Sequence, residues 1–213
     1  MHIPDGFLSP QTWLPAYALA AAGWAWAARD LRARLDETTV PRLAMITALA
    51  YALGLVMVPL PGGTSGHLVG VAMLALLFGL RDAFLCHSLV LLLQALMFGA
   101  GGVTALAINA LAMGLAGSAT ALAAFRLLRR VNEIAAVAVG AWLSVVVAGL
   151  LVAFALGIQP LIAHRADGAP LVFPFGLAVT LPAVLLPHLA IGIGEALLTV
   201  LVWRYARARR WVA

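Results

Sequence analysis

Charged residues and cysteine are both scarce in this sequence. Among its 213 residues, 10% are charged and 64% are hydrophobic, and the mean hydropathy is +1.06. So few charges exclude an ordinary water-soluble domain, which needs a charged surface to stay in solution. The single cysteine, Cys86, excludes a disulfide framework and argues against a metal cluster held by thiolates. The composition therefore predicts an all-α polytopic membrane protein.

Lysine is absent, and all 13 basic residues are arginines that lie between apolar runs. Such positions indicate membrane topology rather than a nucleic-acid-binding surface, so we expect no nucleic-acid partner. No arginine precedes Arg29, whereas a signal peptide would open with positive charge. We therefore expect the mature protein to begin at Met1, with a free α-amine next to a histidine.

Seven apolar segments approach the length of about 20 residues that a helix needs to cross a bilayer. They are residues 11–28, 43–60, 66–80, 83–98, 103–125, 134–157 and 183–203. We interpret Arg81 and Asp82, between the third and fourth segments, as a tight turn at the membrane face. Several prolines predict that residues 158–182 form a loop with a re-entrant or broken helical piece. Without a repeat or a linker, residues 1–213 are expected to form a single integral membrane domain.

The arginines also predict the orientation of the chain, because cytoplasmic loops retain positive charge. With about seven transmembrane helices and the N-terminus outside, twelve of the 13 arginines lie on the inner side and only Arg165 lies outside. We therefore predict a multi-pass protein of the cell (inner) membrane. Its N-terminus is expected outside and its C-terminus in the cytoplasm.

This orientation places the polar, turn-forming segments on the outer side, and Met1 and His2 belong to the first of them. A free α-amine, the amide nitrogen of residue 2 and Nδ1 of His2 can close two chelate rings around one ion. This nearly planar nitrogen set suits Ni(II) or Cu(II) and accommodates Co(II). The alternative is a disordered terminus with an incidental histidine. The stiff turn at Pro4-Asp5-Gly6 favours a shaped terminus.

His67 is the candidate for the fourth ligand. It follows a run of small residues, 62–66, which lets the backbone approach another group closely, and it opens an apolar segment on the outer side. The alternative is a histidine at a helix end that bonds to a carbonyl group. Because polar groups at membrane depth are costly unless they are used, the pairing with His2 favours a ligand.

Further polar side chains lie within the apolar segments. His188 and Glu195 are seven residues apart, so they share one face of the last helix. Each such residue either supports a metal site or forms a hydrogen bond between helices. The same two interpretations apply to residues of the fourth and fifth segments, namely His87, Ser88, Gln94 and Asn109. As candidates to contact the ligands we select Ser65, Asn109 and His188.

Two further patterns suggest other functions. Ser65, within Gly63-Thr64-Ser65-Gly66, resembles the nucleophile of a rhomboid-like intramembrane serine protease, with His188 as the base. This enzyme is the alternative function, although the match covers only four residues. Separately, Ala44, Ala48 and Ala52 form a stripe of small residues that serves either close helix packing or contact with a membrane partner.

Four stretches of the sequence resemble the NikM/CbiM family, the substrate-binding (S) components of energy-coupling factor transporters for nickel and cobalt. They are residues 1–10, residues 61–67, residues 101–104 with Asn109, and residues 188–196. They follow the order of the family along nearly the whole chain. The opening Met-His-Ile-Pro-Asp-Gly is the most specific of them, because it is fixed to residue 1.

The resemblance implies a seven-helix subunit that captures Ni(II) or Co(II) through the amine of Met1, the amide and imidazole of His2, and the imidazole of His67. It implies no catalytic residue and no cofactor beyond the transported ion. The implied partners are a transmembrane coupling subunit and two cytoplasmic ABC ATPases, with a small accessory membrane subunit as a further candidate. The sequence itself has no phosphate-binding glycine motif, so energy would come from separate subunits. A stand-alone channel is disfavoured because a tight four-nitrogen site would hold the ion too long.

Overall fold

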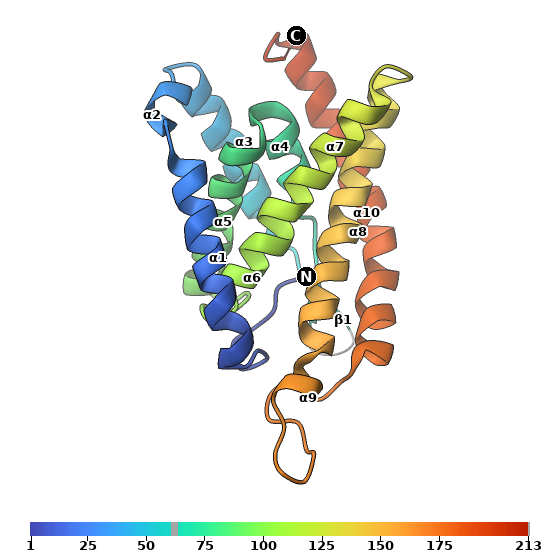
Figure 1. Cartoon of the computed structure of the whole chain (residues 1–213). Coiled ribbons are helices and arrows are strands. Elements are labelled where there is room, and N and C mark those ends of the chain that lie inside the picture. Colours follow the sequence, from blue (N-terminus) through green and yellow to red (C-terminus); the bar gives the residue numbers. More distant parts are fainter. Residues whose placement is uncertain (61–63, 213) are drawn as a thin grey trace.

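The computed structural model of the chain is a bundle of helices with one short β-hairpin (Figure 1). It describes residues 1–60 and 64–212, apart from the side chains of residues 60, 64 and 65. The elements are α1 (Pro10–Ala28), α2 (Leu31–Arg34), α3 (Thr39–Gly54), β1 (Val58–Leu60), β2 (Thr64–Gly66), α4 (Val71–Phe78), α5 (Leu80–Phe98), α6 (Leu106–Asn109), the π-helix η1 (Ala110–Gly117), α7 (Ser118–Leu128), α8 (Glu133–Gly157), α9 (Gln159–Ile162) and α10 (Leu177–Ala208). The strands β1 and β2 pair antiparallel, with Pro59 opposite Ser65.

Each of the seven predicted segments contains a helix, and the predominantly helical class is confirmed. Four helical stretches in the described part are long and apolar enough to cross a membrane: Leu80–Phe98, Leu106–Leu128, Glu133–Ile162 and Leu177–Ala208. The prediction of a spanning helix over residues 66–80 is wrong. Only α4, with eight residues, is helical there, and at 1.5 Å per residue it rises about 12 Å, against about 30 Å for the hydrocarbon core.

The last helix begins earlier than predicted. The prolines at 182 and 187 indicated a loop up to residue 182, but both lie inside α10, which starts at Leu177. Prolines are tolerated in membrane helices when other groups satisfy the carbonyl oxygens they leave free. The predicted loop therefore shrinks to the short helix α9 and the link of residues 163–176.

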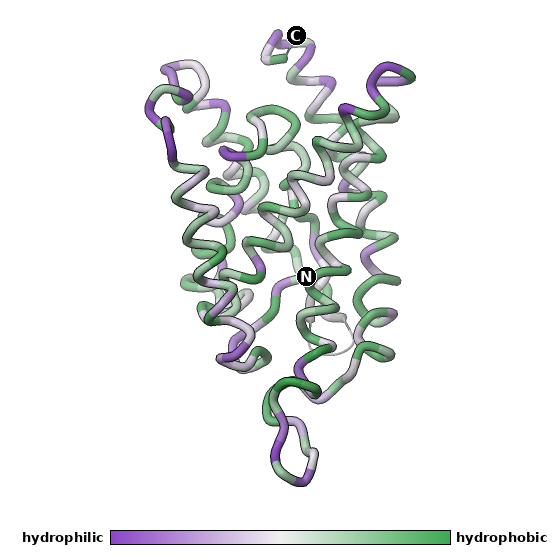
Figure 2. The backbone as a smooth tube through the Cα atoms, viewed as in Figure 1, coloured by the Kyte–Doolittle hydropathy of each residue, from purple (hydrophilic) through white to green (hydrophobic). Residues whose placement is uncertain are grey.

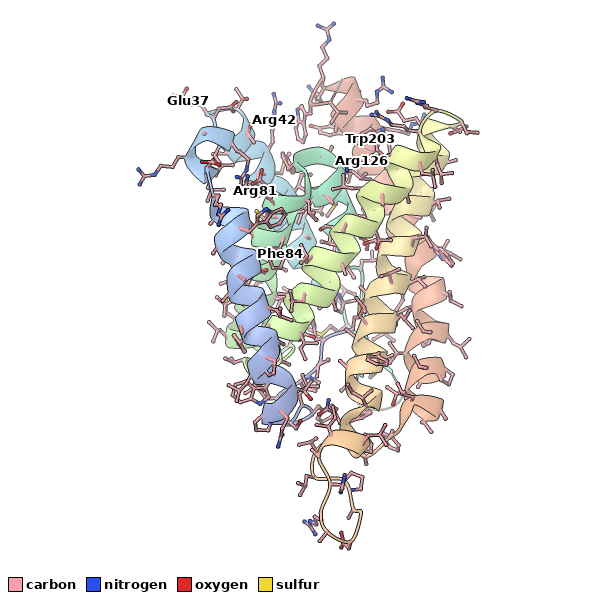
Figure 3. All side chains as sticks on the ribbon, in the orientation of Figure 1. Glu37, Arg42, Arg81, Phe84, Arg126 and Trp203 are labelled. Carbon is pink, nitrogen blue, oxygen red and sulfur yellow. The ribbon has the colours of Figure 1, made fainter. Side chains whose placement is uncertain are left out.

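Polar residues gather at the two ends of the bundle, and the middle is apolar (Figure 2). Arg42, Arg81 and Arg126 lie near one end (Figure 3). At this end Gly79, with φ +87°, makes the turn between α4 and α5. The turn therefore precedes the predicted position, and Asp82 lies in the first turn of α5, where it pairs with Arg34 at 2.8 Å.

The N-terminal arm, residues 1–9, does not stay at the outer end as predicted. It runs back into the bundle, so that the N-terminus lies about midway along the helices (Figure 1). Met1 and Ile3 are fully buried. The apolar side chains of these two residues stabilise this position, because their burial removes hydrophobic surface from water or lipid headgroups. The arm thereby carries His2 into the interior.

Candidate metal centre

His2 and His67 meet inside the bundle. Their ring centroids lie 4.4 Å apart and the ring planes are inclined by 27°. The exposed fractions are 3% for His2 and 5% for His67. The N-terminal arm delivers the first ring and the link between β2 and α4 delivers the second, so the fold brings the two predicted ligand side chains together.

Three ring nitrogens of this pair have no hydrogen-bond partner among the described residues: both nitrogens of His2 and Nε2 of His67. The remaining one, Nδ1 of His67, lies 2.8 Å from the main-chain oxygen of Leu68. A carbonyl oxygen only accepts, so Nδ1 of His67 carries the proton and Nε2 presents a lone pair. A buried polar atom without a partner costs about 1–3 kcal/mol. A metal ion bound by the lone pairs of these nitrogens, which lie in the planes of the rings, would remove part of this cost.

The α-amine of Met1 is the third group of the site. Burial lowers the pKa of this amine from 8.0 to about 4. The amine is therefore neutral at pH 7, and the neutral form has the lone pair that a metal requires. No group of three or more His, Cys, Asp and Glu side chains in the described part of the chain could hold a metal ion. A metal site at His2 and His67 thus needs main-chain nitrogens, as the amino-terminal chelate supplies.

Asn109 holds the N-terminal arm next to His2. Its Nδ2 donates to the main-chain oxygen of Ile3 at 3.1 Å, and its Oδ1 accepts from the Ile3 amide at 3.1 Å. The Asn109 side chain is 2% exposed, so water does not compete for these two bonds. This predicted contact residue touches the segment that carries the ligand.

Asp5 fastens the arm to the loop between α5 and α6. Its carboxylate accepts hydrogen bonds from the amides of Val103 and Thr104 and from the Thr104 hydroxyl. Partial burial alone would raise the pKa of Asp5, but these bonds outweigh it and hold the pKa below its ordinary value. A Cβ at Gly102 would lie 2.4 Å from the Asp5 amide nitrogen. The glycine pair at 101 and 102 therefore gives the arm its space.

Two buried residues that the sequence did not assign to the site also fix its parts. Gln159 of α9 accepts from the Ser9 amide at 3.0 Å and so fixes the far end of the arm. Glu195 of α10 accepts from the amides of Val69 and Gly70 at 2.8 and 2.7 Å. The interhelical bond considered for Glu195 is thus a bond to the link that follows His67. For Glu195 the only signal in the sequence was a polar residue within an apolar segment, and for Gln159, within the predicted loop, there was none.

His188 and His87 are both buried, with exposed fractions of 0% and 2%. Nδ1 of His188 lies 2.6 Å from the Val184 oxygen of its own helix, and its Nε2 has no partner in the described part. Both ring nitrogens of His87 also lack one there. The side chain of Ser65, which the protease alternative would need beside His188, lies outside the described residues, and so do residues 61–63.

Comparison with known protein families identifies the family of this chain. The family model CbiM, described as the cobalt uptake substrate-specific transmembrane region, matches residues 2–213. The chain belongs to the CbiM family. The resemblance to the NikM/CbiM proteins is thereby confirmed. CbiM is a metal-transport family rather than an enzyme family, so the protease alternative finds no support.

Relatives of this CbiM-family chain include nickel transport proteins. It is 38% identical over 211 residues to a probable fused nickel transport protein, LarMN, of Lactiplantibacillus plantarum, with 97% of this chain and 64% of the relative covered. It is 37% identical to the fused nickel transport protein NikMN of Rhodobacter capsulatus, covering 93% of this chain and 59% of the relative. The chain thus spans about three fifths of the length of these relatives.

A solved structure shares the fold of this CbiM-family chain. The crystal structure of a truncated transition metal transporter matches it with a TM-score of 0.94 and 37% sequence identity. The match covers 98% of this chain and 99% of the solved chain. The fold of this chain therefore has a close experimental counterpart.

Proposed function

We propose that this chain captures Ni(II) or Co(II) from the outer side of the cell membrane. It delivers the ion for ATP-driven uptake as the substrate-specific (S) subunit of an energy-coupling factor transporter. One observation carries the proposal: His2 and His67 stack beside a buried, uncharged terminus, and three of their ring nitrogens lack partners among the described residues. The transport functions named for the relatives support it.

The proposed ligands are the α-amine of Met1, the deprotonated amide and Nδ1 of His2, and Nε2 of His67. Four nitrogens favour Ni(II) and Co(II) over Mg(II) and Ca(II), which prefer oxygen ligands. The deprotonated amide adds a negative charge, which offsets part of the cost of holding a divalent cation in a dry interior. In this proposal the metal ion is the transported substrate, and metal capture needs no cofactor besides it.

The proposed topology has seven membrane crossings, with the N-terminus outside and the C-terminus in the cytoplasm. In the third crossing, residues 67–70 form an irregular link between β2 and α4. The placement of arginines near the end that holds Arg42, Arg81 and Arg126 supports this orientation (Figure 3). The opposite end holds the link of residues 163–176 with Arg165 (Figure 1).

The proposed partners are a transmembrane coupling subunit, two cytoplasmic ABC ATPases and, as a further candidate, a small accessory membrane subunit. The helix α3 supports a contact with a membrane partner, because Ala44, Ala48 and Ala52 are all exposed. Ala44 and Ala48 also line an apolar groove of about 450 Å³ between α3 and α5. Small residues let a partner helix approach closely.

Metal binding by the purified protein in detergent tests the site. Native protein should bind one Ni(II) or Co(II), and the His2→Ala and His67→Ala variants should lose stoichiometric binding. His164→Ala is the matched control, because His164 is an exposed loop histidine. Circular dichroism would verify that each variant keeps its helices. Native affinity in His67→Ala would remove His67 from the site.

A one-residue extension tests the chelate more sharply. A glycine added before Met1 turns the amine into an amide and moves His2 to third position, so the chelate rings no longer form. We expect the extended protein to lose stoichiometric Ni(II) binding while it remains folded. If the terminus were merely a lid over a site made elsewhere, the extended protein would keep its affinity, and the amino-terminal chelate would be refuted.

A further inference from the structure

Gln94 of α5 is buried beside the proposed ligand His2, with half of its amide unpaired. Its side chain is 1% exposed. Nε2 donates to the main-chain oxygen of Tyr51 at 3.3 Å, whereas Oε1 has no partner among the described residues. Because a carbonyl oxygen only accepts, the NH2 group must face Tyr51, which turns Oε1 away from α3.

Two observations place the Gln94 amide next to His2. Oε1 of Gln94 and both ring nitrogens of His2 are buried and have no hydrogen-bond partner among the described residues. The main chain agrees, since the Gln94 carbonyl accepts from the amide of Ala100, and a Cβ on the next residue, Gly101, would lie 3.2 Å from Cβ of His2. An unpaired acceptor and an unpaired ring thus lie side by side in the interior.

We propose that Gln94 is the positioning residue that selects the metal-binding tautomer of His2. Its Oε1 accepts the Nε2–H of the imidazole, which leaves the lone pair on Nδ1 for the ion. The inference rests on the proposed function, because the six-membered chelate ring closes through Nδ1 and not through Nε2. In a neutral imidazole one nitrogen carries the proton, and the partner of that N–H decides which one.

Gly54 at the end of α3 gives the Gln94 amide its place. A Cβ at this position would lie 2.3 Å from Nε2 of Gln94 and 3.3 Å from its Cδ. Even an alanine would therefore push the amide away from the Tyr51 oxygen. The helix α3 thus fixes the direction of the amide, and the amide in turn fixes the ring of His2.

In both histidines, the ring nitrogen that donates a hydrogen bond leaves the other nitrogen free for the metal, but the donating nitrogen differs between the two. Nδ1–H of His67 is held by the Leu68 oxygen at 2.8 Å, which leaves Nε2 for the metal. His2 requires the reverse tautomer, and Gln94 supplies the acceptor for it. Among the side-chain amide and carboxylate oxygens of the described residues that are themselves buried, Oε1 of Gln94 alone lacks a donor.

Ni(II) alone is the probe for this inference, with affinity and the visible absorption spectrum of the bound ion as readouts. Gln94→Met keeps the length of the side chain but removes the acceptor, and we expect Ni(II) affinity to fall about 10–100-fold with an altered spectrum. Gln94→Glu keeps an acceptor oxygen and should restore most of the affinity and the native spectrum. Gly54→Ala should resemble Gln94→Met.

Ser88→Ala is the control for general destabilisation, because Ser88 lies on the same helix and accepts a hydrogen bond from Trp24 instead of facing His2. It should leave the Ni(II) spectrum unchanged. If Gln94→Met and Gly54→Ala both bind Ni(II) with native affinity and spectrum while His2→Ala does not bind, the role of Gln94 is refuted and the proposed site stands. Native binding by His2→Ala would instead refute the proposed site itself.

Discussion

Replacing Asn109 by leucine should detach the N-terminal arm without unfolding the bundle. Leucine has about the size of asparagine but can neither accept from the Ile3 amide nor donate to the Ile3 oxygen, the two bonds of 3.1 Å seen in the structure. The arm would have to leave both main-chain groups unpaired inside the protein or swing out into water. The helices keep their own hydrogen bonds in either case.

The expected magnitude follows from these two bonds. Each buried main-chain group left unpaired costs about 1–3 kcal/mol, so the docked arm loses roughly 2–6 kcal/mol. Every 1.4 kcal/mol is tenfold in affinity, and the complete four-nitrogen site requires the docked arm. For a variant whose arm is undocked in the absence of metal, the lower bound predicts Ni(II) binding about 30-fold weaker than that of the native protein, because binding must then restore the docked state.

A competition titration of Ni(II) against a chelator of known affinity would measure this loss, alongside thermal unfolding in detergent. Asn132→Leu is the matched control, because Asn132 caps α8 through the Ala135 amide, outside the metal site. It should cost about 1 kcal/mol of stability and leave Ni(II) affinity unchanged. Affinity within threefold of native in Asn109→Leu would show that the arm docks without this residue, and the reasoning would fail.

Three further outcomes are expected. Glu195→Leu should lower both the melting temperature and Ni(II) affinity, because the amides of Val69 and Gly70 lose their acceptors. Glu195→Gln keeps one acceptor oxygen and should lower both quantities less. Equal losses in the two variants would contradict this role of Glu195. In the metal-free protein, the protection of the arm amides against hydrogen exchange, expressed relative to the intrinsic exchange rate at each pH, should fall as pH falls from 8 to 4. The undocked amine binds a proton near its ordinary pKa of 8.0 and the buried one only near 4, so acid favours undocking; protection that stays constant over this range would contradict the burial. Ala48→Leu should block co-purification with the coupling subunit but leave metal binding unchanged. Unchanged co-purification would show that Ala48 does not contact this partner.

The sequence predicted the helical class and the pair of histidines, because both depend on local patterns. The apolar runs locate the helices, and a histidine at position 2 next to a free amine has only a few chemical uses. The apolar run at residues 66–80 gave a wrong prediction of a spanning helix, because hydropathy reflects burial and not backbone conformation. Residues 71–76 are apolar because other helices surround them, and residues 67–70 before them form no helix.

The supporting contacts could not be predicted, for a different reason. Asp5, Asn109, Gln159 and Glu195 all bond to main-chain amides of segments far away in the sequence. Every residue except proline offers such an amide, so the sequence carries no sign of which one is chosen. A polar residue in an apolar run shows that a partner exists, and only the fold shows where.

The contacts of the N-terminal arm also set an order of assembly during synthesis. Residues 1–9 are synthesised before residues 103, 104, 109 and 159, to which they bond. The arm therefore has no complete binding surface until α9 has been made and most of the helices are inserted. The arm is thus made early and reaches its final place late, and until then the proposed fourth nitrogen, on His67, does not meet the three nitrogens of Met1 and His2.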